Sequence, residues 1–268
     1  MTPRRELADR ALVVRRFPYG ESSLVVHVVT PQHGRLTLIA KGAYRPRSGY
    51  CGVLDLFDTL ELGWRRQRGS DMGLLARGEI AVRRRGLTRD LQRYRAGLAV
   101  LELAGIGARE AEPDPPLFDL TAETLDVLHH GTVEPDLAVT SYDLRFLACM
   151  GLTPALVHCA ACGTDLARGA RGEKLVPFAF GAGGRMCSPC AEEARGSGRR
   201  VEGISPGTLR ITRSILDTPT AHLPRIRLES RVSNEVRSFT RRFLEYHLET
   251  RPRSRRSREP RSRRPARR

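Results

Sequence analysis

The pattern of apolar positions changes once along the chain, near Val82. Before this point, five short segments rich in Val, Leu and Ile are separated by turn sequences such as PYGE, PQHG and RRQRGSD. Short apolar segments bounded by Gly, Pro and Asp are typical of β-strands. The segments are 11–17, 23–30, 34–42, 53–64 and 72–82. They predict a small closed barrel, with an oligonucleotide-binding (OB) fold as the leading candidate and an SH3-like barrel as the second.

After Val82 the apolar spacing becomes helical. Steps of three and four residues predict a helix that begins near Thr88 and carries one apolar stripe. The stripe consists of Leu87, Leu91, Tyr94, Leu98, Leu101 and Gly105. Two further apolar segments end at Gly131 and Gly151, and glycine commonly terminates a helix.

Two more helices are predicted towards the C-terminus. Ser205 and Pro206 have the character of an N-cap followed by a first-turn proline, which predicts a helix through Ile215. The last helix presents an apolar face made of Val232, Val236, Phe239 and Phe243. Because such helices can bury their apolar faces only against one another, the sequence predicts one helical bundle.

Four cysteines interrupt this bundle in two Cys-x-x-Cys pairs, Cys159/Cys162 and Cys187/Cys190. Two such pairs complete a tetrahedral four-thiolate site, and a closed shell of this kind is structural rather than catalytic. A redox role would need one pair within a thioredoxin-like pattern, which neither pair has. The adjacent His158 could compete as a ligand, but four thiolates already suffice. We therefore expect one structural Zn²⁺.

These elements give an α+β multidomain fold, in which an N-terminal five-stranded OB-fold barrel precedes a helical-bundle domain with an inserted four-cysteine zinc module. The expected parts are the OB-fold domain 1–82, the helical domain 83–158 and 195–250, the zinc module 159–194, and an Arg-rich tail 251–268.

The net charge of the chain indicates which kind of molecule it binds. The chain has 46 basic and 30 acidic residues and a net charge of +16, and its last 18 residues hold ten arginines and one glutamate. An excess of arginine favours a phosphate-bearing partner, whereas the tail alone is either an electrostatic tether or a solubilising extension. No stretch reaches the ~18 apolar residues that a membrane span needs. We expect a cytoplasmic protein with no membrane partner.

Motifs of common enzymes are absent from the sequence. There is no phosphate-binding loop and no His-Glu-x-x-His motif, and the segments GIGARE and GAGGRM each lack the third glycine of a dinucleotide site. The sequence His247–Glu249 matches part of a nucleobase-deaminase motif but follows the cysteines instead of preceding them. We expect no enzyme, no catalytic residue and no small-molecule substrate.

The loops and strand ends of the barrel combine cations with aromatic residues. This mixture is typical of single-strand binding, because cations contact phosphates and aromatic rings stack on bases. A solvated charged face with half-buried aromatic residues is the alternative. The aromatic residues are Tyr44, Tyr50 and Trp64. The candidate DNA-binding residues are Arg35, Lys41, Arg45, Arg47, Arg65, Arg66 and Arg68.

Three segments resemble the bacterial recombination mediator family RecO. They are YGESSLVVHVVTPQHGRLTLIAKGAYRPRSGY, GLTPALVHCAACG and RRFLEYHLETRPRSRR, and the resemblance extends to about Arg256. The most specific positions are Gly20, Glu21, Ser22, Thr30, Gly34, Lys41 and Gly42. The tail beyond Arg256 is longer and more basic than the family leads us to expect.

The resemblance implies a role in recombinational DNA repair after DNA damage. Members of the family bind single- and double-stranded DNA, anneal complementary strands, and act with RecR to help RecA replace single-strand binding protein (SSB). They also bind the acidic C-terminal tail of SSB through the helical domain. Lys41 and Arg45 match the family's basic DNA-contact loop, and the four cysteines match its zinc-bearing members. The resemblance also implies association with the nucleoid. The alternative function is a zinc-containing RNA-binding or ribosome-associated OB-fold factor, because OB barrels serve RNA equally well.

Overall fold

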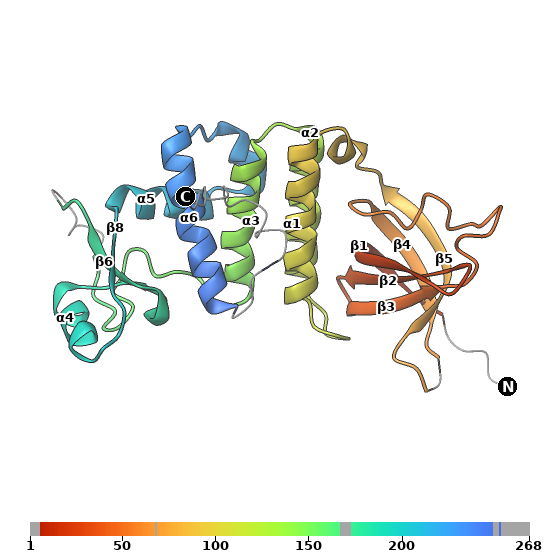
Figure 1. The fold of residues 1–268 in the computed structure, drawn as a ribbon, viewed down its shortest axis with the longest axis horizontal. Coiled ribbons are helices and arrows are strands. Elements are labelled where there is room, and N and C mark those ends of the chain that lie inside the picture. Colours follow the sequence, from red (N-terminus) through yellow and green to blue (C-terminus); the bar gives the residue numbers. More distant parts are fainter. Residues whose placement is uncertain (1–5, 68, 167–172, 249–251, 253–268) are drawn as a thin grey trace, which may run out of the picture.

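The structure is a computed structural model that describes residues 6–67, 69–166, 173–248 and 252. Three parts follow one another along an elongated molecule: a β-barrel at one end, a group of helices in the middle, and a small module at the other end (Figure 1). Except for Pro252, the expected tail 251–268 lies outside the described residues, as does Arg68.

The N-terminal barrel has five strands that close in the order β1-β2-β3-β5-β4. Neighbouring strands are antiparallel except β3 and β5, which pair in parallel at Leu38 and Ile39. The strands are β1 (Leu7–Tyr19), β2 (Ser23–Thr30), β3 (Gly34–Ala40), β4 (Thr59–Arg65) and β5 (Gly73–Val82). This is an OB-fold, so the predicted barrel is confirmed.

The barrel core follows from the alternation of side chains along each strand. On β2, Leu24, Val26 and Val28 point inward and join the barrel core, so Val25 and His27 point to the outer face. The pairing of β1 with β2 shifts between Val13 and Arg15, at an irregularity in the strand.

The middle of the molecule consists of helices whose ends follow from local sequence signals. Asp90 and Asp114 accept hydrogen bonds from the backbone N–H groups that open α1 and α2, and Ser205 does the same for α5. Gly131 ends α2 in the left-handed conformation, at a φ of 69°. The helices are α1 (Leu91–Gly107), α2 (Pro115–His130), α3 (Pro135–Cys149), α5 (Pro206–Asp217) and α6 (Ser230–His247), with short 3-10 helices η1 (Arg85–Thr88) and η3 (Thr220–Arg225).

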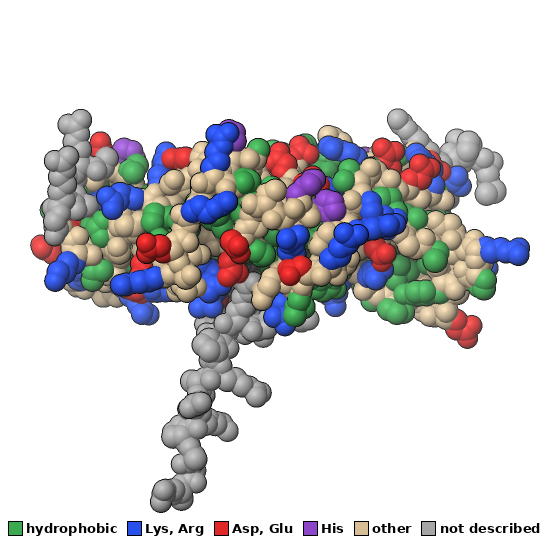
Figure 2. Space-filling model, turned by 90° about the horizontal axis from the view of Figure 1, so that it is seen from above, with side chains coloured by type: hydrophobic (Ala, Val, Ile, Leu, Met, Phe, Trp, Pro, Cys, Tyr) green, Lys and Arg blue, Asp and Glu red, His purple; other side chains and the backbone are tan. Residues whose placement is uncertain are grey.

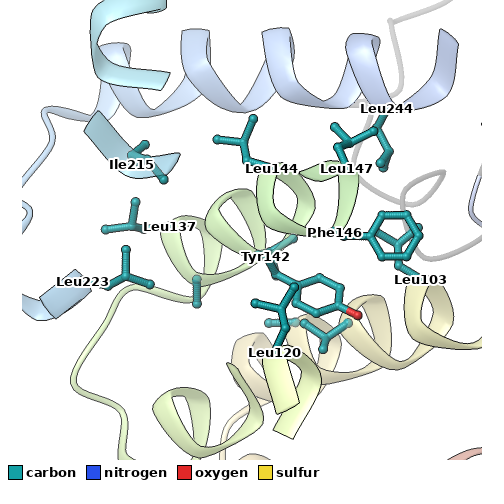
Figure 3. Packing of buried hydrophobic residues seen from close by; sticks show 14 of the residues in the cluster. Leu103, Leu120, Leu137, Tyr142, Leu144, Phe146, Leu147, Ile215, Leu223 and Leu244 are labelled. Atoms are coloured by element: carbon teal, nitrogen blue, oxygen red, sulfur yellow. The ribbon is translucent and has the colours of Figure 1, made fainter. Parts of the chain in front are cut away.

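Helix α3 lies at the centre of the helical core. In Figure 3 its side chains Tyr142, Leu144 and Leu147 point towards the residues of several surrounding elements. The hydroxyl groups of Tyr142 and Thr121 lie 3.0 Å apart, so the buried phenol oxygen has a hydrogen-bond partner. The predicted last helix is confirmed, since Val236, Phe239 and Phe243 are buried. Among the described residues, no helix has the length and hydropathy needed to cross a membrane.

Helix α1 differs from its prediction. It begins after Asp90 and not near Thr88. Leu91 is 60% exposed, so the predicted stripe is wrong at this residue, whereas its first residue, Leu87, is buried. The buried residues of α1 include several alanines and a glycine and are not confined to one stripe. The reason is that α1 is packed between the barrel and helices α2 and α3. At Gly97 a Cβ atom would lie 2.6 Å from Leu87 and 2.7 Å from Phe57, so glycine permits this close packing.

The barrel is fixed to the helices by the β2–β3 turn. Gly34 has a φ of +61°, and a Cβ atom there would lie 2.3 Å from the carbonyl oxygen of Glu112. The backbone N–H of Arg35 donates to the carbonyl of Arg109 at 2.8 Å. One apolar cluster includes Leu12 and Val29 of the barrel together with residues of all the long helices, so barrel and helices share a core.

The distal module contains a three-stranded sheet in the order β7-β6-β8. Phe178 and Phe180 pack against Phe239 and Phe243 of α6, with ring centroids 5.1–6.3 Å apart, and so join the module to the helices. Its elements are β6 (Val176–Ala179), η2 (Phe180–Ala182), β7 (Gly184–Arg185), α4 (Ser188–Gly196) and β8 (Glu202–Ile204). The sheet thus includes residues beyond the segment 159–194.

Candidate metal centre and nucleic-acid interface

The four predicted cysteine ligands lie together in the distal module. The sulfur atoms of Cys159, Cys162, Cys187 and Cys190 are all within 4.8 Å of one another, and those of Cys162 and Cys187 are 3.8 Å apart. Four sulfur atoms bound tetrahedrally to zinc at about 2.3 Å would lie about 3.8 Å apart. The geometry therefore fits a metal ion without rearrangement of the chain.

Two local turns present these thiols. After the first pair, Gly163 adopts a φ of +74° and its N–H donates to the carbonyl of Cys159 at 2.9 Å. The second pair opens α4, where Cys187 is the N-cap, and the N–H of Cys187 donates to the sulfur of Cys159 at 3.4 Å. Each pair thus folds into a tight turn with its sulfur atoms on one side.

The electrostatics of the cluster favour a bound cation. Although burial raises it, backbone N–H groups of Cys162 and Cys187 hold the pKa of the Cys159 thiol down to about 6. Hydrogen bonding with Cys187 and then Cys162 raises the pKa of Cys190 to about 12. A cluster that ionises one thiol readily resists ionising all four, because thiolates repel one another, and a divalent cation removes that repulsion.

The part of the module around the cysteines has only a small apolar core of its own, because Phe178 and Phe180 of its sheet belong to the core shared with the helices. Its buried apolar set consists of Cys159, Ala179, Met186, Ala191 and Ala194. A core of this size buries too little apolar surface to hold a fold by itself, and small domains of this kind usually depend on metals or disulfides. The four cysteines can bind a metal ion, and that ion would replace a larger core.

The long loop between β3 and β4 carries three exposed cations that have no ion pair among the described residues. Lys41, Arg45 and Arg47 are exposed. None of the three has an ion pair with a carboxylate in the described part of the chain. The N–H of Tyr44 donates to the carbonyl of Ser22 at 2.9 Å, which places this loop against the β1–β2 turn. The three side chains are therefore available to an anion.

Two of the other predicted cations, Arg35 and Arg65, already have carboxylate partners. Arg35 donates to the carbonyl of Gly105 at 3.1 Å and pairs with Glu110 at 3.0 Å, so it also serves the junction with the helices. Arg65 pairs with Glu6 at 3.1 Å. Arg66 is exposed and lines a groove of about 390 Å³ beside β3.

The predicted aromatic partners are mostly structural. Trp64 is 2% exposed and belongs to the barrel core, and the hydroxyl of Tyr50 donates to the carbonyl of Leu75 at 3.0 Å. Only Tyr44 of the three is fully exposed, at 55%. Two exposed aromatic residues were missed: Phe17 and Tyr19, at the end of β1. The alternation of cations and rings in RRFPYG is the sequence signal that could have found them.

Cations also occur at the opposite end of the molecule. Beside the metal site, a groove of about 570 Å³ is lined by Arg199, Arg200 and Arg242 together with Glu202 and Tyr246. Figure 2 shows Lys and Arg side chains along the whole length of one face, interspersed with Asp and Glu. The location of the cations on the surface therefore does not show which basic region binds a ligand.

Comparison with known proteins gives consistent matches over nearly the whole chain. Residues 1–83 match the family described as Recombination protein O N terminal, and residues 88–256 match the family described as Recombination protein O C terminal. A protein from Anaeromyxobacter dehalogenans strain 2CP-1 named DNA repair protein RecO is 33% identical over 246 residues, which cover 90% of this chain and 92% of that protein. The protein of the same name from Bacillus subtilis strain 168 is 29% identical over 234 residues, covering 87% and 86%.

Proposed function

Since the chain belongs to the RecO family of DNA repair proteins, we propose that it is a recombination mediator that binds DNA, anneals complementary strands and helps to load the recombinase on SSB-coated single-stranded DNA. A role in DNA repair follows from the family itself. The alternative, an RNA-binding or ribosome-associated factor, is not favoured by the relatives.

The observation that carries the proposal is the group of unpaired cations on the OB-fold barrel. Lys41, Arg45 and Arg47 are exposed on one loop and have no described ion-pair partner. A cation without a partner can bind a phosphate without first breaking an ion pair. Binding then releases counterions from the DNA, so affinity is high at low salt and depends little on sequence.

Annealing follows from this electrostatics without covalent chemistry. Two complementary strands repel each other through their phosphates, and a protein that neutralises both backbones lowers that repulsion. Base pairing then supplies the driving free energy. No nucleophile or general base is needed, and we propose that the protein is not an enzyme.

The metal site has a structural part in this proposal. We propose Zn²⁺ as the ion, because four thiolates in tetrahedral arrangement are the ligands that structural zinc prefers. Cys159, Cys162, Cys187 and Cys190 would hold it. Their shell leaves no open position for a substrate, so the ion fixes the module and takes no part in DNA chemistry.

The family resemblance supplies the proposed partners. They are RecR and the acidic C-terminal tail of SSB, in addition to single- and double-stranded DNA. The helical domain is the proposed site for the SSB tail, and the protein would act in the cytoplasm, at the nucleoid.

A strand-annealing assay tests the proposal. The wild-type protein is expected to accelerate annealing of complementary oligonucleotides, both bare and coated with SSB. The variant Lys41→Glu/Arg45→Glu is expected to anneal about tenfold more slowly, since it loses two phosphate contacts and adds repulsion. Arg95→Glu/Arg210→Glu is the matched control, because it makes the same change in net charge at exposed arginines of α1 and α5.

Two outcomes would contradict the proposal. Failure of the wild-type protein to accelerate annealing of either substrate would refute strand annealing. Equal loss in the two charge-reversal variants would refute the barrel loop as the DNA site. Tighter binding to single-stranded RNA than to DNA of the same sequence, at matched salt, would favour the RNA-binding alternative.

A further inference from the structure

The outer half of β1 carries an exposed aromatic surface that the proposed function does not use. All residues from Arg15 to Tyr19 are exposed, although they belong to a paired strand. Phe17 and Tyr19 are 36% and 51% exposed. Single exposed apolar side chains are ordinary. Two successive aromatic side chains on one face of a strand, next to cations, form a surface that can contact both flat rings and anions.

The pairing of β1 with β2 shows that these side chains share a face. Phe17 is opposite Val25 and Tyr19 is opposite Ser23, while Arg15 is opposite His27. Cross-strand partners lie on the same side of a sheet, and Val25 and His27 point out of the barrel. Phe17 and Tyr19 therefore lie on the outer face, and their backbone positions are about 6.8 Å apart along the strand.

The aromatic face is held in place and flanked by cations. The guanidinium of Arg15 lies 5.8 Å from the ring centroid of Phe17, and the ring centroid of His27 lies 5.5 Å from it. Burial, followed by the charges of Arg15 and Arg35, lowers the pKa of His27, so His27 stays neutral at pH 7. On the opposite face of β1, Arg16 pairs with Asp55 and anchors the strand to the β3–β4 loop.

This face runs directly into the unpaired cations of the barrel. Lys41 follows Ala40, which pairs with Leu24, and Tyr19 pairs with the adjacent residue Ser23. The backbone bond from Tyr44 to Ser22 brings the rest of the basic loop to the same turn. The rings and these cations thus occur at neighbouring positions of the sheet and its adjoining turn.

We propose that Phe17 and Tyr19 are the base-stacking platform for single-stranded nucleic acid, while Lys41 and Arg45 bind the adjoining phosphates. This inference rests on the proposed DNA binding and deepens it, because stacking needs unpaired bases and so separates single strands from duplexes. Two rings at two-residue spacing on an extended strand suit consecutive bases of an extended chain, and stacking accepts any base.

The test uses a normal oligonucleotide and an abasic oligonucleotide of the same length and charge. The variant Phe17→Ala/Tyr19→Ala is expected to bind the normal single strand about tenfold more weakly than wild type, and to bind the abasic strand and duplex DNA with unchanged affinity. Tyr246→Ala is the matched control, because Tyr246 is 56% exposed and lies on α6, outside the barrel. It is expected to leave all three affinities unchanged.

A spectroscopic signal reports stacking directly. Phe17→Trp adds an exposed indole to a chain whose one tryptophan, Trp64, is buried. Its fluorescence is expected to be quenched by normal single strands and to change little with abasic strands.

The possible failures are distinct. If wild type binds no single-stranded DNA, the proposed function and this inference fall together. If wild type binds it and the double alanine variant binds equally well, or loses the same factor on abasic strands, the platform alone is refuted. Absence of quenching in Phe17→Trp while binding persists also refutes it.

Discussion

The two ends of the molecule both carry arginines in a groove or loop, yet they differ in what those arginines already bind. At the barrel end, Lys41, Arg45 and Arg47 have no carboxylate partner among the described residues. At the metal end, Glu202 pairs with Arg242 at 2.5 Å and with Arg200 at 3.0 Å. The carboxylate of Glu202 thus forms ion pairs with two of the arginines that line the groove.

This difference shows that the number of cations does not measure the capacity to bind phosphate. An arginine held by a carboxylate must give up that pair before a phosphate gains from it. Arg242 also lies 4.6 Å from the ring centroid of Phe180, so it packs as well as pairs. Lys41, Arg45 and Arg47 of the barrel loop have no ion pair with a carboxylate and no cation–ring contact within the described residues, so they can bind an external anion directly.

Loss of the metal is expected to give the largest difference between the two ends, because it should destabilise the distal module and leave DNA binding by the barrel nearly unchanged. Cys187→Ser is expected to reduce bound zinc from about one ion per chain to none and to lower the thermal stability of the distal module, because ion binding contributes free energy of folding. Single-strand affinity of the barrel is expected to stay within about twofold of wild type, since its phosphate contacts persist. Metal analysis, thermal unfolding and oligonucleotide titration measure these quantities.

Cys51→Ser provides the control for that experiment. Cys51 is an exposed cysteine on the barrel loop, outside the metal cluster, and its replacement should change neither metal content nor stability. A wild-type protein that purifies without metal and unfolds at the same temperature as Cys187→Ser would contradict the metal site.

Salt dependence gives the next largest difference. Arg45→Glu is expected to flatten the slope of log affinity against log salt by about 0.7 for a single strand, which corresponds to one lost phosphate contact. Arg200→Glu makes the same change in charge at a paired arginine, and a smaller change in slope is expected. Equal changes for the two variants would show that pairing with Glu202 does not matter.

The smallest expected effect is a gain at the metal end. Glu202→Gln would release Arg200 and Arg242, and single-strand affinity at low salt is expected to rise by about twofold to fivefold, with a steeper salt dependence. The hydrogen bond from Arg242 holds the pKa of Glu202 below its ordinary value, so the carboxylate is present in wild type throughout neutral pH. Unchanged affinity in this variant would mean that the groove does not meet DNA even when its cations are free.

The sequence predicted a structural element correctly where residues close together in the chain determine that element. The β-strand segments, the left-handed Gly131 and the N-cap Ser205 depend on periodicity and backbone preference, and the structure has each of them. The cysteine spacing likewise predicted the metal cluster, because each pair of ligands lies on a turn of its own.

Other features depend on contacts between distant residues and could not be read locally. The stripe on α1 failed at Leu91, which opens the helix and is 60% exposed, whereas other residues of α1 join a core shared with the barrel that only the tertiary fold creates. Trp64 looked like a stacking surface but lies inside the barrel, and Arg35 proved to be shared with Glu110, 75 residues further along the chain. The exposure of Phe17 and Tyr19 required the strand pairing.

The shared core also sets how the molecule behaves mechanically. A single cluster of buried apolar residues extends from Leu12 in the barrel through the helices to Phe178 in the distal module, so apolar packing continues across both junctions. The shared core therefore holds the barrel and the distal module at a set distance from each other. Under the proposed function, DNA bound on the barrel and a partner bound at the distal module would be held in one fixed spatial relation.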